Sequence, residues 1–162
     1  MSLQKELGFV NPMANRGHEA LLNIVLTGTL LTKEADRLLR PLGLTDAQFN
    51  VLMLLKYQSR GGQMNQTHLG GMLLVNRSNV TGLIDRMEKA GWVERGADAG
   101  DRRVNMLRLT AAGRRIVERG EKAYFRWIER LSGASSEDEQ SRLCRLLEQV
   151  RLRLRGEEKG GR

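Results

Sequence analysis

The chain has 162 residues, 40% of them hydrophobic and 28% charged, which predicts an ordinary globular protein of one domain or two small units sharing a core. Its 27 Lys and Arg residues against 19 Asp and Glu give a formal charge of +8, which favours a polyanionic partner, nucleic acid first and an anionic membrane second. The single cysteine, Cys144, excludes an intramolecular disulfide and a cysteine-rich metal site, and no apolar run reaches the roughly 18 residues of a membrane span.

The N-terminal part predicts an arm followed by a long helix. Residues 1–17 contain Asn-Pro and Arg-Gly breakers and no apolar core of a signal peptide, so we expect a flexible arm and a cytoplasmic protein. A helix is predicted from His18 to Arg40, and Pro41 with Gly43 ends it. Its apolar residues cover more than one face, which indicates more than one partner surface.

A second helix follows, and either Thr45 or Asp46 can cap its first turn. Residues 59–64 (SRGGQM) predict a flexible turn. The apolar positions of this second helix are Phe49, Leu52, Met53 and Leu55.

A third, short helix is predicted after Asn65, which is a good N-cap residue. Its apolar side is formed by Leu69, Met72 and Leu73. Gly70 and Gly71 inside it cost roughly 1 kcal/mol each relative to Ala. We attribute them to a tight helix–helix crossing that needs small residues.

The fourth helix, from Asn76 to Lys89, is the most informative element, and Gly91 ends it. Because only a turn near residues 74–75 separates it from the third helix, the pair predicts a helix-turn-helix whose second member enters the major groove. One side of this helix forms an apolar stripe of Val80, Leu83, Ile84 and Met87. The other carries Ser78, Asn79, Thr81, Gly82, Asp85 and Arg86, short or polar residues that can reach base edges or phosphates.

Two predicted strands, 92–95 and 104–109, form a hairpin after this helix. The turn between them carries Arg102 and Arg103, and adjacent arginines suit a narrow minor groove. Asp98 or Asp101 can hold one of the two arginines in place. A solvated charged loop is the alternative, and the preceding helix makes it less favoured.

The C-terminal part predicts two more helices. Thr110 caps a long one, and the turn SGASSEDE leads to a last helix containing Leu143, Leu146, Leu147 and Val150. Residues 156–162 are expected to be a disordered tail. The predicted fold class is therefore mostly α with a small β-hairpin wing.

The segments RSNVTGLIDRMEKAGWVER and DRRVNMLRLTAAG resemble the signature of the MarR family of winged helix-turn-helix regulators, and with the flanking helices the resemblance covers about residues 18–155. It implies a winged helix-turn-helix domain at 45–110. It also implies an intertwined helical dimerisation unit formed by 18–44 plus 111–155, and hence a homodimer.

The resemblance also assigns roles to residues. Arg102 or Arg103 matches the arginine of the minor groove, and Asp101 matches an acid that orients the wing arginines. The candidate DNA-binding residues are Asn65, Gln66, Thr67, His68, Asn76, Arg77, Ser78, Asn79, Thr81, Gly82, Arg86, Asp98, Asp101, Arg102 and Arg103. Cys144 lies in the last helix, whereas the oxidation-sensing branch has its cysteine near the start of the first, which disfavours peroxide sensing. Because its helix is apolar, we interpret Cys144 as a core residue.

We therefore expect a sequence-specific regulator of double-stranded DNA, a repressor that binds a pseudo-palindromic operator and is released by a small aromatic or phenolic effector. The sequence does not identify the effector or its binding residues. The alternative is a constitutive or non-specific DNA-binding architectural protein without an effector. An enzyme is disfavoured: His18 and His68 lie in different elements without metal-ligand spacing, and no phosphate loop is present, so no metal, cofactor or catalytic residue is expected.

Overall fold

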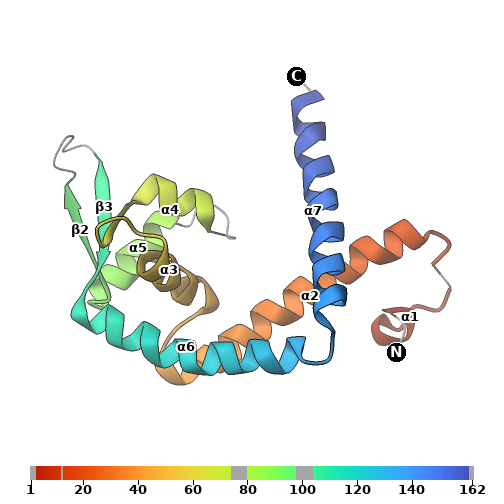
Figure 1. Cartoon of the computed structure of the whole chain (residues 1–162), viewed down its shortest axis with the longest axis horizontal. Helices are drawn as coiled ribbons and strands as arrows, with labels where there is room; N and C mark the ends of the chain where they lie inside the picture. The colour runs from red at the N-terminus through yellow and green to blue at the C-terminus, as the bar shows by residue number, and fades with distance from the viewer. Residues whose placement is uncertain (1–2, 12, 74–79, 98–103, 161–162) are drawn as a thin grey trace. The chain divides into compact units, whose positions relative to one another are not determined.

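The computed structural model describes residues 3–11, 13–73, 80–97 and 104–160, with the backbone alone at 157–160. The chain divides into two compact units, Met1–Glu121 and Lys122–Arg162, and each is described by itself. The first unit contains α1 (Leu3–Leu7), α2 (Arg16–Leu39), a 3-10 turn (Arg40–Leu42), α3 (Asp46–Tyr57), β1 (Gln63–Asn65), α4 (Gln66–Met72), α5 (Val80–Lys89), β2 (Val93–Ala97), β3 (Asn105–Leu109) and the start of α6 (Ala111–Ser132) (Figure 1). The second contains the rest of α6 and α7 (Glu137–Gly160). The mostly helical class with a small sheet is confirmed.

Local side-chain bonds set where the first helices begin. Asn15 accepts hydrogen bonds from the N–H groups of Gly17 and His18, so α2 begins at Arg16, earlier than the sequence predicted. Thr45, not Asp46, caps α3, and its partner Gln48 completes a capping box. Residues Leu3–Leu7 form α1 with Leu3 buried, so the segment predicted as a flexible arm is helical there.

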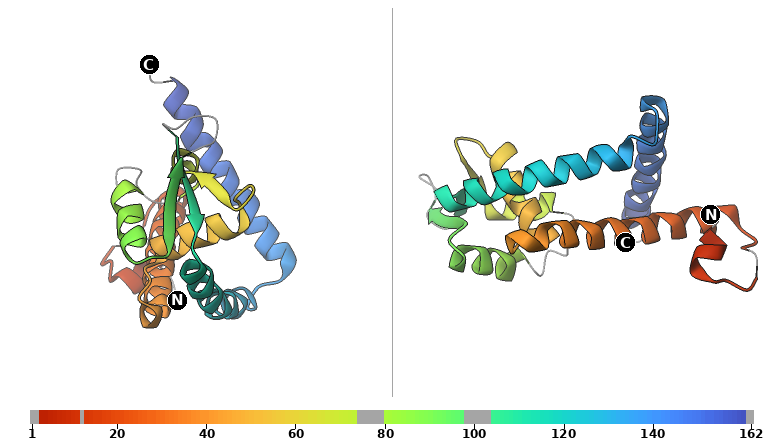
Figure 2. Two further views of the ribbon diagram at one scale, coloured as in Figure 1. Left: turned by 90° about the vertical axis from the view of Figure 1, so that its left-hand side faces the viewer. Right: turned by 90° about the horizontal axis from the view of Figure 1, so that it is seen from below.

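The sheet has three antiparallel strands in the order β1-β3-β2, and Figure 2 shows β3 between its two neighbours. The prediction of a flexible turn at 59–64 was therefore wrong in part. Gly61 and Gly62 do form a turn, with φ of +58° and +77°, but β1 then pairs with β3 and Met64 is only 4% exposed. Burial of this one methionine explains why the three-residue strand forms although its other two residues are polar.

The hydrophobic core of the described residues lies in the first unit, around α3, α4, α5 and the sheet. The predicted inward stripe of α5, Val80, Leu83, Ile84 and Met87, is confirmed, since each is 6% exposed or less. Phe49 and Leu52 of α3 are fully buried, and Leu107 of β3 closes the core from the sheet side. A stable packed core therefore holds α5 and leaves its opposite face at the surface.

The two glycines of α4 do not mark a tight crossing, so that interpretation was wrong. A Cβ built on Gly70 would lie 3.6 Å from the Val80 side chain, an ordinary van der Waals distance, and one on Gly71 would meet nothing within 4 Å. The tight approaches are at α6 instead. A Cβ on Gly113 would lie 2.0 Å from the Trp92 carbonyl oxygen, and one on Gly120 would lie 2.7 Å from the Phe49 ring.

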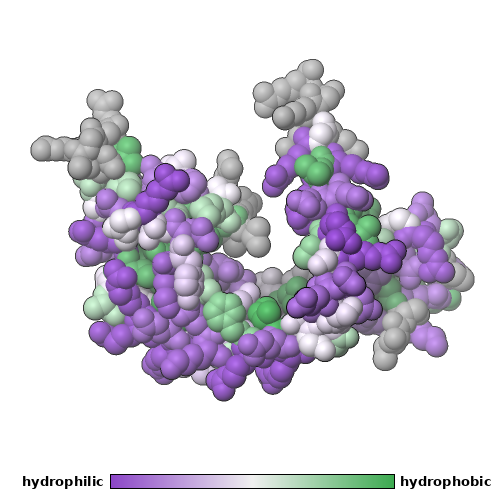
Figure 3. All heavy atoms as spheres, in the orientation of Figure 1, coloured by the Kyte–Doolittle hydropathy of each residue, from purple (hydrophilic) through white to green (hydrophobic). Residues whose placement is uncertain are grey.

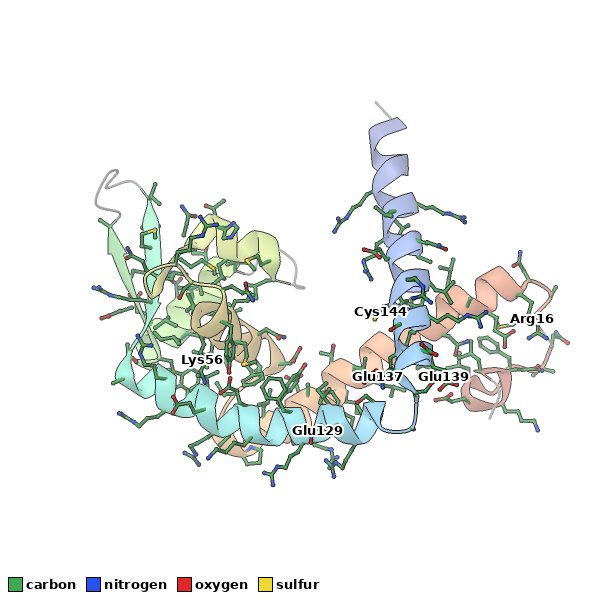
Figure 4. The ribbon with its side chains drawn as sticks, viewed as in Figure 1. Arg16, Lys56, Glu129, Glu137, Glu139 and Cys144 are labelled. Carbon is green, nitrogen blue, oxygen red and sulfur yellow. The ribbon has the colours of Figure 1, made fainter. Side chains whose placement is uncertain are left out.

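The second unit consists of helical residues with little burial. Ser136 and Glu139 form a capping box at the start of α7, in which the Ser136 hydroxyl accepts the Glu139 N–H. No described side chain of α7 is buried, and apolar residues stand among hydrophilic ones along it (Figure 3). Cys144, labelled in Figure 4, is exposed, so its interpretation as a core residue was wrong.

The helix α7 also continues to Gly160, so residues 156–160 are helical and not a disordered tail. Gly156 lowers the stability of the helix at this point. The Glu, Glu and Lys that follow are good helix formers, and one glycine did not outweigh them.

Candidate nucleic-acid interface

The start of α4 brings together four of the candidate DNA-binding residues. Asn65 is its N-cap, and its side-chain oxygen accepts hydrogen bonds from Thr67 N–H at 2.7 Å and His68 N–H at 3.2 Å. Thr67 and His68 are exposed, whereas Asn65 and Gln66 are half-buried. The cap fixes the backbone, so the side chains of the first turn are held in one orientation.

The outer face of α5 carries the next three candidates. Thr81 and Arg86 are exposed and Gly82 is half-buried, on the side of the helix opposite the buried stripe. The remaining candidates lie outside the described residues: Asn76, Arg77, Ser78, Asn79, Asp98, Asp101, Arg102 and Arg103. The elements next to these gaps are described. The helix α5 follows the first gap, β2 and β3 lie on either side of the second, and all three contribute to the same core.

A surface cleft of about 420 Å³ joins α4, α5 and β3. Four candidates line it, three consecutive ones at the start of α4 and Thr81 of α5, and Asn105 of β3, which sequence reasoning missed, adds an amide. The lining residues are Asn65, Gln66, Thr67, Gly70, Val80, Thr81, Val104 and Asn105. Amide and hydroxyl groups dominate its polar part, and such groups donate to phosphates and to base edges.

Arg95 of β2 is a second residue that sequence reasoning missed. Its guanidinium forms ion pairs with Asp85 at 2.5 Å and with Glu88, both on α5, and its Nε donates to Gln66 of α4 at 3.4 Å. Burial lowers the pKa of Arg95, but the bonds to Asp85 and Glu88 outweigh that effect and raise it above its ordinary value. The i, i+3 spacing of the two acids was the available signal, because it places them on one helix face.

The end of α3 is tied to α6 by a buried carboxylate. Glu121 of α6 is 8% exposed and accepts from Lys56 Nζ at 2.5 Å and from the Tyr57 hydroxyl. The Lys56 side chain, labelled in Figure 4, extends from α3 toward α6. Hydrogen bonding to Glu121 is the main cause that raises the pKa of Lys56 and of Tyr57 above their ordinary values.

Two further properties of the described residues concern membranes and metals. None of the helices in the described ranges is long and apolar enough to cross a membrane. Over the same ranges no group of three His, Cys, Asp or Glu side chains is placed to hold a metal ion.

Two short helices close together in the sequence, α4 and α5, are followed by the antiparallel pair β2 and β3, and this order of elements is that of a winged helix-turn-helix protein. The family model of the MarR family matches residues 44–104, which include α3 to β2 and end just before β3. The HTH-type transcriptional regulator FarR of Neisseria gonorrhoeae is 31% identical over 111 residues, covering 65% of this chain and 72% of that protein. The chain belongs to the MarR family of transcriptional regulators.

Two solved structures are similar over most of the chain. A mutant of MarR from E. coli, in complex with operator DNA, is 29% identical with a TM-score of 0.64 and covers 79% of this chain and 95% of that one. An organohalide-sensing transcriptional regulator with bound 2,4-dichlorophenol has a TM-score of 0.76 and covers 90% of this chain and 87% of that one. At 19% identity the second likeness shows the fold alone.

Proposed function

We propose that this protein is a sequence-specific DNA-binding repressor that acts as a homodimer on a pseudo-palindromic operator. The observation that carries the proposal is the exposed polar face of α5, which lies beside the start of α4 and the β2–β3 hairpin on one packed core. The E. coli relative bound to operator DNA supports it. Because the proposed target is DNA, we also propose a cytoplasmic location and no catalytic activity.

The roles that we propose for the two parts of the chain follow the family resemblance. Residues 45–110 read DNA, with α5 and the residues just before it in the major groove and residues 98–103 in the minor groove. Residues 18–44 plus 111–155 hold two copies together. Exposed leucines support this assignment, since Leu21 of α2 is 51% exposed and Leu143 and Leu146 of α7 are 56% and 52% exposed.

The wing arginines give the first test. Arg102→Ala with Arg103→Ala should weaken operator binding at least about tenfold and lower the salt slope, because two phosphate- or groove-contacting charges are lost. A gel-shift titration at several salt concentrations measures both quantities. The matched control is Arg126→Ala with Arg130→Ala, which removes the same charge from exposed positions of α6. Equal behaviour of the two double variants would contradict the wing assignment.

We further propose that a small aromatic or phenolic ligand releases the protein from DNA, supported by the neighbour of the same fold that binds 2,4-dichlorophenol. A ligand that binds the state incompatible with DNA better than the competent state shifts the population away from DNA. The test adds 2,4-dichlorophenol, and cyclohexanol as a non-aromatic control, to the preformed complex. Release by the phenol alone supports the proposal, whereas no release by either would favour a constitutive DNA binder.

The experiment that tests the function as a whole is the selection of bound sequences from random duplex DNA by the full chain. We expect a two-fold symmetric site with half-sites roughly 10 bp apart, bound at least about a thousandfold more tightly than random duplex. Tight binding without sequence preference would show an architectural protein instead. Failure to bind duplex DNA would refute the proposed function.

A further inference from the structure

Arg95 is the point where three elements of the candidate interface meet. It lies on β2, and its side chain is only 23% exposed. The side chain contacts Asp85, Glu88 and Gln66, and in addition its backbone N–H donates to Glu88 at 3.2 Å. We call these four residues the Arg95 cluster; it joins the hairpin, α5 and the start of α4.

The chemistry of the guanidinium makes this junction rigid. Arginine stays charged at every accessible pH, and its planar fork binds two acceptors in fixed directions. In the Arg95 cluster each of the three side-chain nitrogens has its own acceptor. The buried stripe fixes α5 on its inner side, and the Arg95 cluster fixes it against the hairpin on its outer side.

Without Arg95, the negative charges of Asp85 and Glu88 would be unfavourable on this side of α5. Asp85 and Glu88 are 51% and 41% exposed on a helix that would face phosphates, where negative charge opposes binding. Their ion pairs with Arg95 neutralise part of that charge. A role in holding the helix explains why two carboxylates stand on the side of α5 that faces the hairpin.

We infer that Arg95 is a positioning residue for DNA recognition, which through Asp85 and Glu88 fixes the angle between α5 and the hairpin and so sharpens sequence discrimination. The inference rests on the proposed function, in which α5 and the hairpin contact DNA at the same time. A helix held at one angle brings its side chains to the base edges together, whereas a helix free to tilt loses directional contacts first and keeps phosphate contacts.

The decisive variant is Asp85→Asn with Glu88→Gln in the full chain. It raises the net charge by two, so phosphate electrostatics alone would tighten binding to every duplex. The inference requires the opposite for the selected site: the ratio of operator affinity to random-duplex affinity should fall at least about tenfold. Arg95→Lys is the second variant, because lysine keeps the charge but cannot bridge both carboxylates. It should lower the same ratio.

The matched control is the exposed ion pair on the neighbouring strand. Arg108 of β3 pairs with Glu94 of β2 at 2.8 Å, and their side chains are 54% and 50% exposed. Arg108→Lys and Glu94→Gln should leave the specificity ratio within about twofold of the wild type. Thermal unfolding of all variants separates loss of fold from loss of discrimination, because a merely stabilising contact would change the unfolding temperature and not the ratio.

The outcomes distinguish this inference from the proposed function. If the wild type prefers a selected site and the cluster variants keep that preference, the inference is wrong and the proposed function stands. If the cluster variants lose it while the control variants keep it, the inference is supported. If the wild type itself shows no preference, the proposed function fails and the inference fails with it.

Discussion

The core around the sheet buries its apolar residues, whereas helix α7 leaves most of its leucines exposed. In the first region Phe49, Leu52 and Leu107 are fully buried within one chain. In the second, Leu143, Leu146, Leu152 and Leu154 are each more than half exposed. Burying a leucine is worth about 1.5–3 kcal/mol, so the first region is stabilised by its own packing and the second is not. The region around the sheet is therefore packed within one copy, and in the proposed homodimer the exposed leucines of α7 are what the second copy would cover.

The largest expected effect is in the complete region. Phe49→Ala should lower the free energy of unfolding by about 3–5 kcal/mol, because it removes a ring that is 0% exposed and leaves a cavity against α6. Denaturant unfolding measures it. Val10→Ala, at a side chain 93% exposed, is the control and should change stability by less than about 0.5 kcal/mol. Comparable losses in both variants would mean that the core is not where the structure places it.

The tie between α3 and α6 is next in size. Glu121→Gln should cost about 1.5–3 kcal/mol at neutral pH, because the charge-assisted bonds from Lys56 and Tyr57 are weakened. Both partners have a pKa raised by Glu121 from ordinary values of 10.5 and 10.0, so the stabilisation is complete below those values and is lost as pH rises through the raised pKa values. The difference in unfolding free energy between wild type and variant should therefore shrink above about pH 10. A difference that grows with pH would contradict this ion-pair assignment.

The exposed region gives a smaller effect that depends on protein concentration. Leu143→Ala with Leu146→Ala should raise the dissociation constant of the proposed dimer at least about tenfold, since the two substitutions remove apolar area that the second copy would cover. Sedimentation velocity at several concentrations measures it. Arg142→Ala with Arg145→Ala, on the same helix, is the control for loss of helix propensity and charge. An unchanged dissociation constant in the leucine variant would show that the interface lies at another surface.

The smallest expected effect is a gain. Gly71→Ala should stabilise the protein by roughly 0.5–1 kcal/mol, because a methyl group there meets no atom within 4 Å and alanine favours helix. The same substitution at Gly113 is the matched contrast, since its Cβ would collide with the Trp92 carbonyl, and it should destabilise. Calorimetric unfolding of both variants shows whether each substitution stabilises or destabilises the protein. A loss at Gly71 would show that α4 needs glycine for a reason other than packing.

The elements that were predicted correctly from sequence are those whose signals are local. The stripe of α5 repeats at helical spacing, and the caps Thr45, Asn65 and Thr110 precede their helices directly. The strand β1 was missed because its only apolar residue, Met64, pairs with a strand more than forty positions later, at Leu107. A three-residue strand has too little pattern of its own to be recognised.

The residues of the candidate site show the same difference between local and distant signals. Thr81 and Arg86 were predicted from the polar face of one helix, which is a local pattern; both lie at the surface, and their contact with DNA stays a prediction. Arg95 was missed because its partners come from α5 and α4, and no periodicity along β2 indicates an ion pair with another element. Cys144 was assigned to a core from the apolar pattern of its helix, but such a pattern does not tell whether the covering surface belongs to the same chain.

The measurement that tests the account most directly is the mass of the protein by light scattering, alone and on its selected duplex. We expect two chains, each of 18.3 kDa, in free solution and two chains on one two-fold symmetric site. A single chain in solution and on DNA, at concentrations where the site is saturated, would contradict it. The exposed leucines of α7 would then need another explanation.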